Sequence, residues 1–80
     1  MSQHTPHELH EEFPADADRI HALKTSNAHF SRLADEYHEI NRQVHRAEAG
    51  IEPMESLAET ELRKKRAHLK DEIARILAAG

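Results

Sequence analysis

Apolar residues recur at intervals of three and four residues through the middle of the chain. The six positions are Phe30, Leu33, Tyr37, Ile40, Val44 and Ala47. This heptad spacing places them on one face of an α-helix and is typical of coiled-coil seams. Asn27 precedes the series and suits an N-cap, and Gly50 follows it and suits the C-terminal end. The pattern therefore predicts a helix over about residues 28–48.

A second apolar series follows after a short connector that contains Pro53. Its members are Leu62, Leu69, Ile73 and Ile76, with Arg66 at the position that completes the heptad repeat. The series predicts a helix over about residues 57–78. Two helices of similar length joined by a short turn predict an antiparallel, coiled-coil-like hairpin. With the turn near Glu52, Arg66 lies close to Tyr37, where it either stacks on the ring or extends outward to water.

The N-terminal part of the chain carries weaker signals. Pro14 suits the first position of a helix, and Asp16 and Asp18 place negative charge on its first turn. These residues predict a short helix over about residues 14–24. Residues 1–12 are rich in His and Glu and predict a flexible tail without apolar contacts. The expected organisation is this tail followed by one all-α helical-hairpin domain over residues 13–80.

The predicted hairpin is too small to cover its own apolar seams. Two helices leave half of each seam in water, and chains of this size commonly need a crosslink or oligomerisation. The sequence contains no Cys, which excludes a disulfide or a thiolate metal site. We therefore expect self-association into a homodimer or larger helical bundle, with a further protein partner as an additional expectation. The expected core and interaction seam consists of Phe30, Leu33, Tyr37, Ile40, Val44, Leu62, Arg66, Leu69, Ile73 and Ile76.

Charge and composition narrow the functional classes. The formal net charge is -4, which gives no general attraction to nucleic acid or anionic lipid. No apolar run approaches the roughly 20 residues that span a bilayer. Residues 1–12 have no apolar region, so we do not expect them to act as a secretory signal. We expect a cytoplasmic protein that does not enter a membrane. The basic segment Arg63–Lys70 indicates nucleic-acid association as the alternative function, although acidic neighbours offset it and no aromatic residues interleave it.

The eight histidines are the most unusual feature of the composition. His4, His7 and His10 are spaced by three and could share one face of a helix, but a flexible tail is not a preorganised metal site. The serines and acidic pairs show no arrangement of nucleophile and base, and no Gly-rich loop is present to bind phosphate. We therefore expect a non-enzymatic protein with no catalytic residue, cofactor or metal site.

Several ordered segments resemble the small bacterial YdcH-like proteins, a family of unknown function. The similarity covers about residues 13–77 and rests on Leu23-Lys24, residues 27–33, residues 36–40, residues 50–53 and residues 62–73. The resemblance implies a helical hairpin in a bacterial cytosolic protein. It implies no activity and supplies no catalytic or ligand-binding residues.

Overall fold

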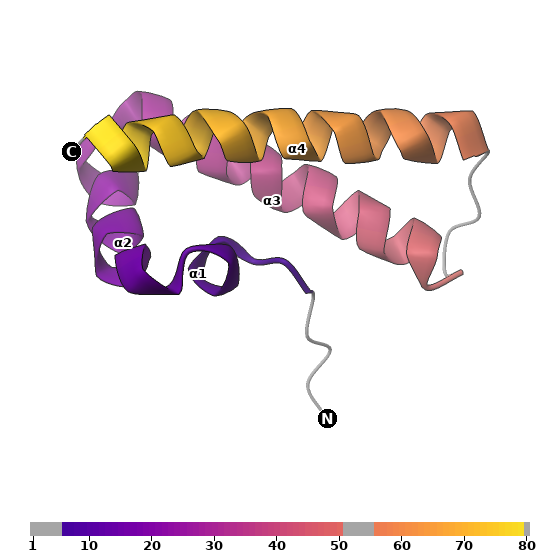
Figure 1. The fold of residues 1–80 in the computed structure, drawn as a ribbon, viewed down its shortest axis with the longest axis horizontal. Helices are drawn as coiled ribbons and strands as arrows, with labels where there is room; N and C mark the ends of the chain where they lie inside the picture. The colour runs from indigo at the N-terminus through magenta and orange to yellow at the C-terminus, as the bar shows by residue number, and fades with distance from the viewer. Residues whose placement is uncertain (1–5, 51–55, 80) are drawn as a thin grey trace.

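The computed structural model describes residues 6–50 and 56–79, and this part of the chain is all-α, as predicted (Figure 1). Its elements are α1 (Leu9–Glu12), the 3₁₀ helix η1 (Pro14–Asp16), α2 (Ala17–Ser26), α3 (Ala28–Glu48) and α4 (Ser56–Ala79). The most extensive helix contact joins α3 to α4 as a hairpin, and α2 packs on α3. The predicted connector at Glu52 and Pro53 and the first of the tail histidines, His4, lie outside the described residues.

Helix α3 begins and ends at the residues that the sequence indicates. The side chain of Asn27 accepts a hydrogen bond from the Phe30 amide at 3.0 Å, which satisfies one donor of the first turn. At the other end, Gly50 has a φ of 76°, a left-handed conformation that costs little without a Cβ atom. Its amide donates to the carbonyl of Ala47 at 3.2 Å and closes the helix.

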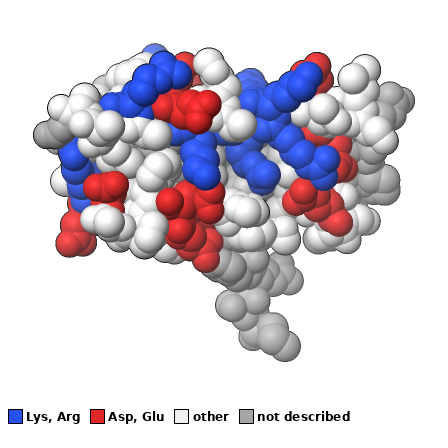
Figure 2. All heavy atoms as spheres, in the orientation of Figure 1, with Lys and Arg blue, Asp and Glu red and all other residues white. Residues whose placement is uncertain are grey.

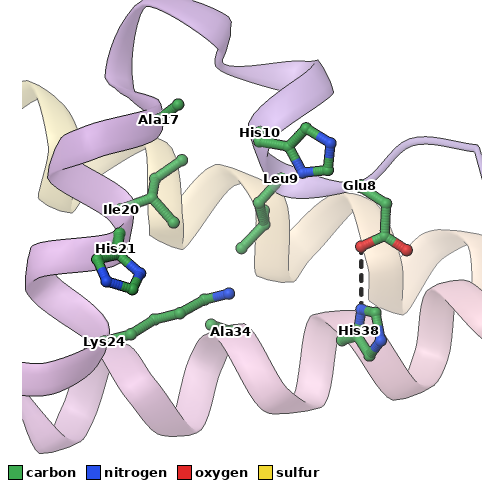
Figure 3. Close-up of a pocket in the computed structure, with 9 residues that line it drawn as sticks. All are labelled: Glu8, Leu9, His10, Ala17, Ile20, His21, Lys24, Ala34 and His38. Carbon is green, nitrogen blue, oxygen red and sulfur yellow. Dashed lines mark hydrogen bonds and ion pairs between the residues drawn. The ribbon is translucent and has the colours of Figure 1, made fainter.

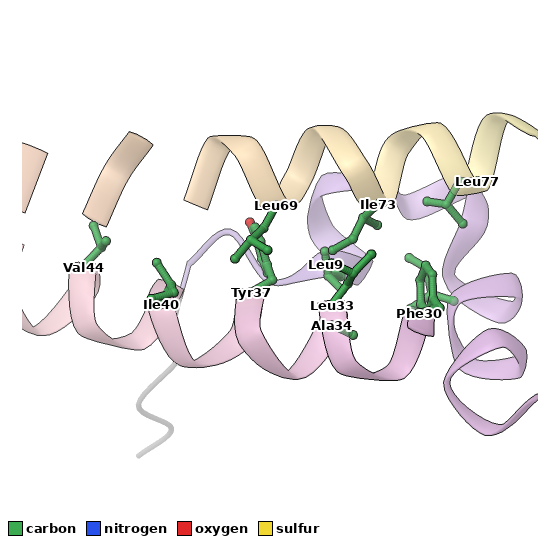
Figure 4. Close-up of a cluster of buried hydrophobic side chains, with 11 residues drawn as sticks. Leu9, Phe30, Leu33, Ala34, Tyr37, Ile40, Val44, Leu69, Ile73 and Leu77 are labelled. Atoms are coloured by element: carbon green, nitrogen blue, oxygen red, sulfur yellow. The ribbon is translucent and has the colours of Figure 1, made fainter. Parts of the chain in front are cut away.

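The hydrophobic core lies between the two long helices and is closed by the N-terminal elements (Figure 4). Helix α3 contributes its seam together with Ala34, and α4 contributes residues spaced by four, which are Leu69, Ile73 and Leu77. Ile20 of α2 and Leu9 of α1 complete the buried set. Burial of a large aliphatic side chain contributes about 1.5–3 kcal/mol, so this cluster accounts for the association of all four helices.

The N-terminal segment differs from the expected tail. The sequence predicts no apolar contacts for residues 1–12, but Leu9 is 7% exposed and belongs to the core. The Glu8 amide donates to the side chain of Glu11 at 3.2 Å, which supports the single turn of α1. A single Leu among His and Glu residues forms no hydrophobic repeat, so the sequence does not indicate that Leu9 is buried. Its burial depends on core residues from α2, α3 and α4, which only the folded chain brings together.

The short helix predicted over residues 14–24 is present with shifted ends. Its first turn is the 3₁₀ helix η1, and α2 continues to Ser26. The hydroxyls of Thr25 and Ser26 donate to the carbonyl of Ala22 at 2.8 and 2.9 Å, so these residues extend the helix. Asn27 then ends it with an extended backbone, at φ -130° and ψ 106°.

Candidate functional site

Most of the predicted seam is occupied within the chain itself. Seven seam residues are buried, namely Phe30, Leu33, Tyr37, Ile40, Val44, Leu69 and Ile73. The other three, Leu62, Arg66 and Ile76, are partly buried. Leu77, which was not predicted, is buried beside Ile76 because the α4 stripe follows a spacing of four residues. The role of the seam in an assembly stays a prediction, and its seven buried residues offer no free surface to a partner.

A buried polar residue that the sequence does not single out connects three segments. Asn41 is 1% exposed and donates from Nδ2 to the carbonyl of Pro6 at 2.8 Å. Its Oδ1 accepts a hydrogen bond from Nη1 of Arg66 at 3.0 Å. The two alternatives expected for Arg66, stacking on the Tyr37 ring or extending to water, are therefore both replaced by this bond to Asn41. The cation–ring contact in the described part of the chain is made by Lys70, whose Nζ lies 5.9 Å from the Phe13 ring centroid. A single Asn at the edge of an apolar stripe gives no sequence signal for this role.

Tyr37 reinforces the attachment of the N-terminal segment. Its hydroxyl donates to the carbonyl of His7 at 2.6 Å, and the residue is 1% exposed. Burial, with a smaller contribution from the nearby Glu12 carboxylate, raises the pKa of the Tyr37 phenol to about 12. The phenol is therefore a neutral donor at physiological pH, and its role here is structural.

The basic segment Arg63–Lys70 is largely engaged with acidic or amide partners. Arg63 pairs with Glu48 at 3.0 Å and also with Glu59. His68 lies 2.9 Å from Glu72. Lys70 pairs with Glu12 and thereby lowers the pKa of that carboxyl. Figure 2 accordingly shows basic and acidic side chains side by side along this surface.

The first half of α4 is the least covered part of the hairpin. Residues 56–68 include no buried residue, whereas the second half carries all three buried residues of the helix. Leu57 is 73% exposed, and Leu62 is only partly buried. In Figure 1, α3 and α4 diverge toward their connection, which leaves this stretch at the open end of the hairpin. We call residues 56–68 the open half of α4 and take it as the candidate interaction site.

One exposed stripe of the open half combines apolar and charged side chains. Leu57, Glu61, Lys64 and His68 are spaced by four, three and four residues and therefore share a face of the helix. All four are exposed, and Glu61 and Lys64 have no ion pair within the described part of the chain. Such a stripe has the residue types of a small helix–helix contact.

Neither a metal cluster nor a membrane span is found in the described residues. Across residues 6–50 and 56–79, no three His, Asp or Glu side chains are grouped so that they could hold a metal ion. The helices of these ranges are also too polar or too short to cross a bilayer.

Comparison with known proteins identifies one family. A family model described as "Protein of unknown function (DUF465)" matches residues 30–77. The matched region covers α3 from its first turn and nearly all of α4, whereas α1 and α2 precede it. No curated protein and no solved structure matches the chain.

Proposed function

We propose, for a chain that belongs to the DUF465 family of proteins of unknown function, that it is a non-enzymatic association module that pairs with a second copy of itself. The pairing surface is the open half of α4. The observation that carries the proposal is the uneven burial of this helix. Its first half lies inside the region that the family model matches and contains no buried residue. A bacterial, YdcH-like identity and a cytoplasmic location form part of the same proposal.

The charge order of the exposed stripe favours a second copy as the partner. Two copies related by a twofold axis would cross with their open halves antiparallel. An axis between Leu62 and Arg63 sets Glu61 of each copy opposite Lys64 of the other. The same axis sets Leu57 opposite His68. The same face of α4 thus carries both the negative and the positive side chain of each contact, as an isologous interface requires.

Most basic side chains of the segment Arg63–Lys70 already have partners within the chain, which supports association with protein over association with nucleic acid. Phosphate contacts need free cationic side chains along one surface. Within the described part of the chain, Arg63, Arg66 and Lys70 already have partners. The exposed Lys64 and Lys65 remain for contacts with phosphate. Two lysines can make few such contacts, and the formal net charge of the chain is -4.

A charge-swap series tests the pairing. Glu61→Lys alone and Lys64→Glu alone each set like charges across the proposed axis. We expect each to weaken self-association several-fold to about tenfold, because each surface pair contributes roughly 0.2–1 kcal/mol and the axis repeats it. The double variant Glu61→Lys, Lys64→Glu restores opposite charges and should regain wild-type affinity. Sedimentation equilibrium at low ionic strength measures these dissociation constants.

Arg75→Glu is the matched control, because it reverses a charge on the same exposed side of α4 but beyond the open half. It should leave the dissociation constant unchanged, and circular dichroism should show equal helicity for all variants. Single variants that associate like wild type would reject this surface. A double variant that is weaker than both single variants would reject the antiparallel pairing.

A further inference from the structure

Residues 6–12, which we call the strap, lie on the hairpin and begin with two main-chain contacts. Nδ2 of Asn41 donates to the carbonyl of Pro6 at 2.8 Å, and the hydroxyl of Tyr37 donates to the next carbonyl, that of His7, at 2.6 Å. Both donors belong to α3 and are four residues apart, so they lie on one face of the helix. Two donors that meet successive carbonyls bind a peptide backbone rather than particular side chains.

The donors of α3 are prepared for carbonyl partners. Nη1 of Arg66 donates to Oδ1 of Asn41 at 3.0 Å, which orients the amide and leaves its Nδ2 group for a carbonyl. Asn41 and Tyr37 are each 1% exposed beneath the strap. Because a buried donor without a partner costs free energy, any chain that covers these two residues must supply carbonyls to both.

Three side chains of the strap complete its attachment. Leu9 belongs to the hydrophobic core, and Glu12 pairs with Lys70 of α4. The Glu8 carboxylate lies 3.0 Å from Nδ1 of His38. The strap thus offers two carbonyls, an apolar anchor and carboxylates within seven residues. We call the residues that receive these groups the strap site: Ile20, Ala34, Tyr37, His38, Asn41 and Lys70.

The apolar part of the strap site has more room than Leu9 uses. A pocket of about 200 Å³ lies between α1, α2 and α3, and Leu9 lines it together with Ala17, Ile20 and Ala34 (Figure 3). In Figure 3 the Leu9 side chain points from α1 toward Ala34 of α3, with Ile20 beside it. A larger apolar side chain at this position would gain contacts with the apolar residues of the pocket.

The strap itself has few buried contacts. Leu9 is its one buried residue, and α1, which contains Leu9, has four residues. His7 has a φ of 64°, in the left-handed region that is unfavourable for a residue with a Cβ atom. A short segment with one buried side chain opens at a lower cost in free energy than the core of a domain.

We propose that the strap occupies a docking site, and that the strap site binds an acidic peptide segment of a partner protein in place of the strap. The partner segment supplies two successive carbonyls to Tyr37 and Asn41, a carboxylate to Lys70, and an aromatic side chain at the position of Leu9. The aromatic side chain gives the partner its advantage over the strap, because it fills more of the pocket. Tyr37, Asn41 and Lys70 lie inside the region that the family model matches, whereas the strap precedes it.

Binding of short labelled peptides to the full chain tests this proposal. The probes are synthetic peptides of residues 6–13 with the wild-type sequence, with Leu9→Phe and with Leu9→Ala, and fluorescence anisotropy measures their affinities. We expect the Leu9→Phe peptide to bind most tightly. The Leu9→Ala peptide should bind about tenfold or more weakly than the wild-type peptide, since each methylene that is no longer buried costs roughly fourfold.

Substitutions that release the strap should raise the affinity of the chain for the peptides. Leu9→Ala and Glu12→Gln in the protein remove different contacts of the strap. We expect the Leu9→Phe peptide to bind about tenfold or more tightly to the first variant and roughly two- to fivefold more tightly to the second. The affinity rises because the strap then occupies the site in fewer molecules. Glu36→Gln changes an exposed glutamate of α3 and is the matched control, with no expected effect.

Substitutions in the strap site should have the opposite effect. In the Leu9→Ala background, Tyr37→Phe and Asn41→Ala each remove one donor and should weaken binding of the Leu9→Phe peptide about three- to tenfold. Gln43→Ala removes an exposed contact with Glu39 on the same helix and should leave the affinity unchanged. Circular dichroism checks the helicity of every variant, and Glu12→Gln replaces Leu9→Ala as the background if helicity falls.

The proposal is overturned if neither released variant binds the peptides more tightly than wild type, because the strap would then be a fixed part of the fold. Unchanged binding by both Tyr37→Phe and Asn41→Ala would also overturn it, because the peptide would then lie elsewhere. A wild-type peptide that binds as tightly as the Leu9→Phe peptide would reject an aromatic partner segment in favour of strap exchange between two copies. Since the strap site contains no residue of the exposed stripe on α4, peptide binding and self-association can fail separately.

Discussion

Tyr37 offers a direct test of the packing at the level of one residue. It is the single tyrosine of the chain, so its ionisation can be followed by ultraviolet absorbance without interference. Burial raises its pKa from 10.0 to about 12 in the folded protein. We expect absorbance titration of the native protein to show ionisation near pH 12, and a chain unfolded in urea to titrate near the ordinary value.

The raised pKa of Tyr37 also determines the direction in which the stability of the fold changes at alkaline pH. A raised native pKa means that the unfolded state loses the phenolic proton first, so stability must fall as pH rises from about 10 to 12. Tyr37→Phe should lack this part of the alkaline decline, which urea melts at several pH values would reveal. A native tyrosine that titrates near pH 10 would contradict the burial of Tyr37 in the core.

Two leucines of α4 allow a matched comparison of burial. Leu69 is 5% exposed and Leu57 is 73% exposed on the same helix. We expect Leu69→Ala to lower the free energy of unfolding by about 2–5 kcal/mol through lost burial and a residual cavity. Leu57→Ala should change the stability of the folded chain by less than about 0.5 kcal/mol. Urea melts at protein concentrations too low for self-association measure both losses. Equal losses for the two variants would contradict the assignment of the buried and exposed faces of α4.

At the level of elements, Asn41 connects α3 to α4 and to the segment before α1. Asn41→Ala removes the partners of both the Pro6 carbonyl and the Arg66 guanidinium. We expect a loss of about 1–3 kcal/mol in the free energy of unfolding, because two part-buried hydrogen bonds, each worth about 0.5–1.5 kcal/mol, are lost. Thermal or urea melts measure it.

The control for Asn41→Ala is Gln43→Ala on the same helix. The Gln43 amide donates to Glu39 at 3.2 Å in an exposed contact, so its loss should cost less than about 0.5 kcal/mol. Similar losses for the two variants would show that the described Asn41 contacts contribute little to holding the three segments together.

The helices that could be predicted from sequence are those that carry their own repeat and end signals. The bounds predicted for the two long helices, 28–48 and 57–78, lie within one residue of Ala28–Glu48 and Ser56–Ala79. Asn27 and Gly50 fix the ends of α3 locally, without help from tertiary contacts. Heptad spacing and capping are properties of neighbouring residues, which is why they are legible in a single sequence.

Features that depend on distant parts of the chain could not be predicted. Leu9 is buried in a core that residues of α2, α3 and α4 share, and the hydrogen bonds of the buried Asn41 are made to Pro6 and Arg66. The pocket walls likewise come from three separate helices. The seam residues were identifiable from spacing, but the uneven cover of α4 was not, because exposure depends on where α3 ends relative to α4.

The charge of the whole molecule predicts its behaviour between pH 7.5 and 5. The formal charge of -4 would become +4 if all eight histidines were protonated, and the isoelectric point is about 6.0. We expect light scattering to rise near pH 6 while circular dichroism shows largely unchanged helicity, because most described histidines are exposed. A loss of helicity at that pH would indicate that a histidine titration disrupts the core instead.

The central claim concerns the whole molecule: the hairpin leaves an open half of α4 that a second copy covers. Sedimentation equilibrium of the wild-type chain over a range of micromolar concentrations tests it most directly. We predict a mass that rises with concentration to that of a dimer or larger, together with a melting temperature that rises in parallel. A monomer at every concentration, melting cooperatively at a temperature independent of concentration, would contradict the claim.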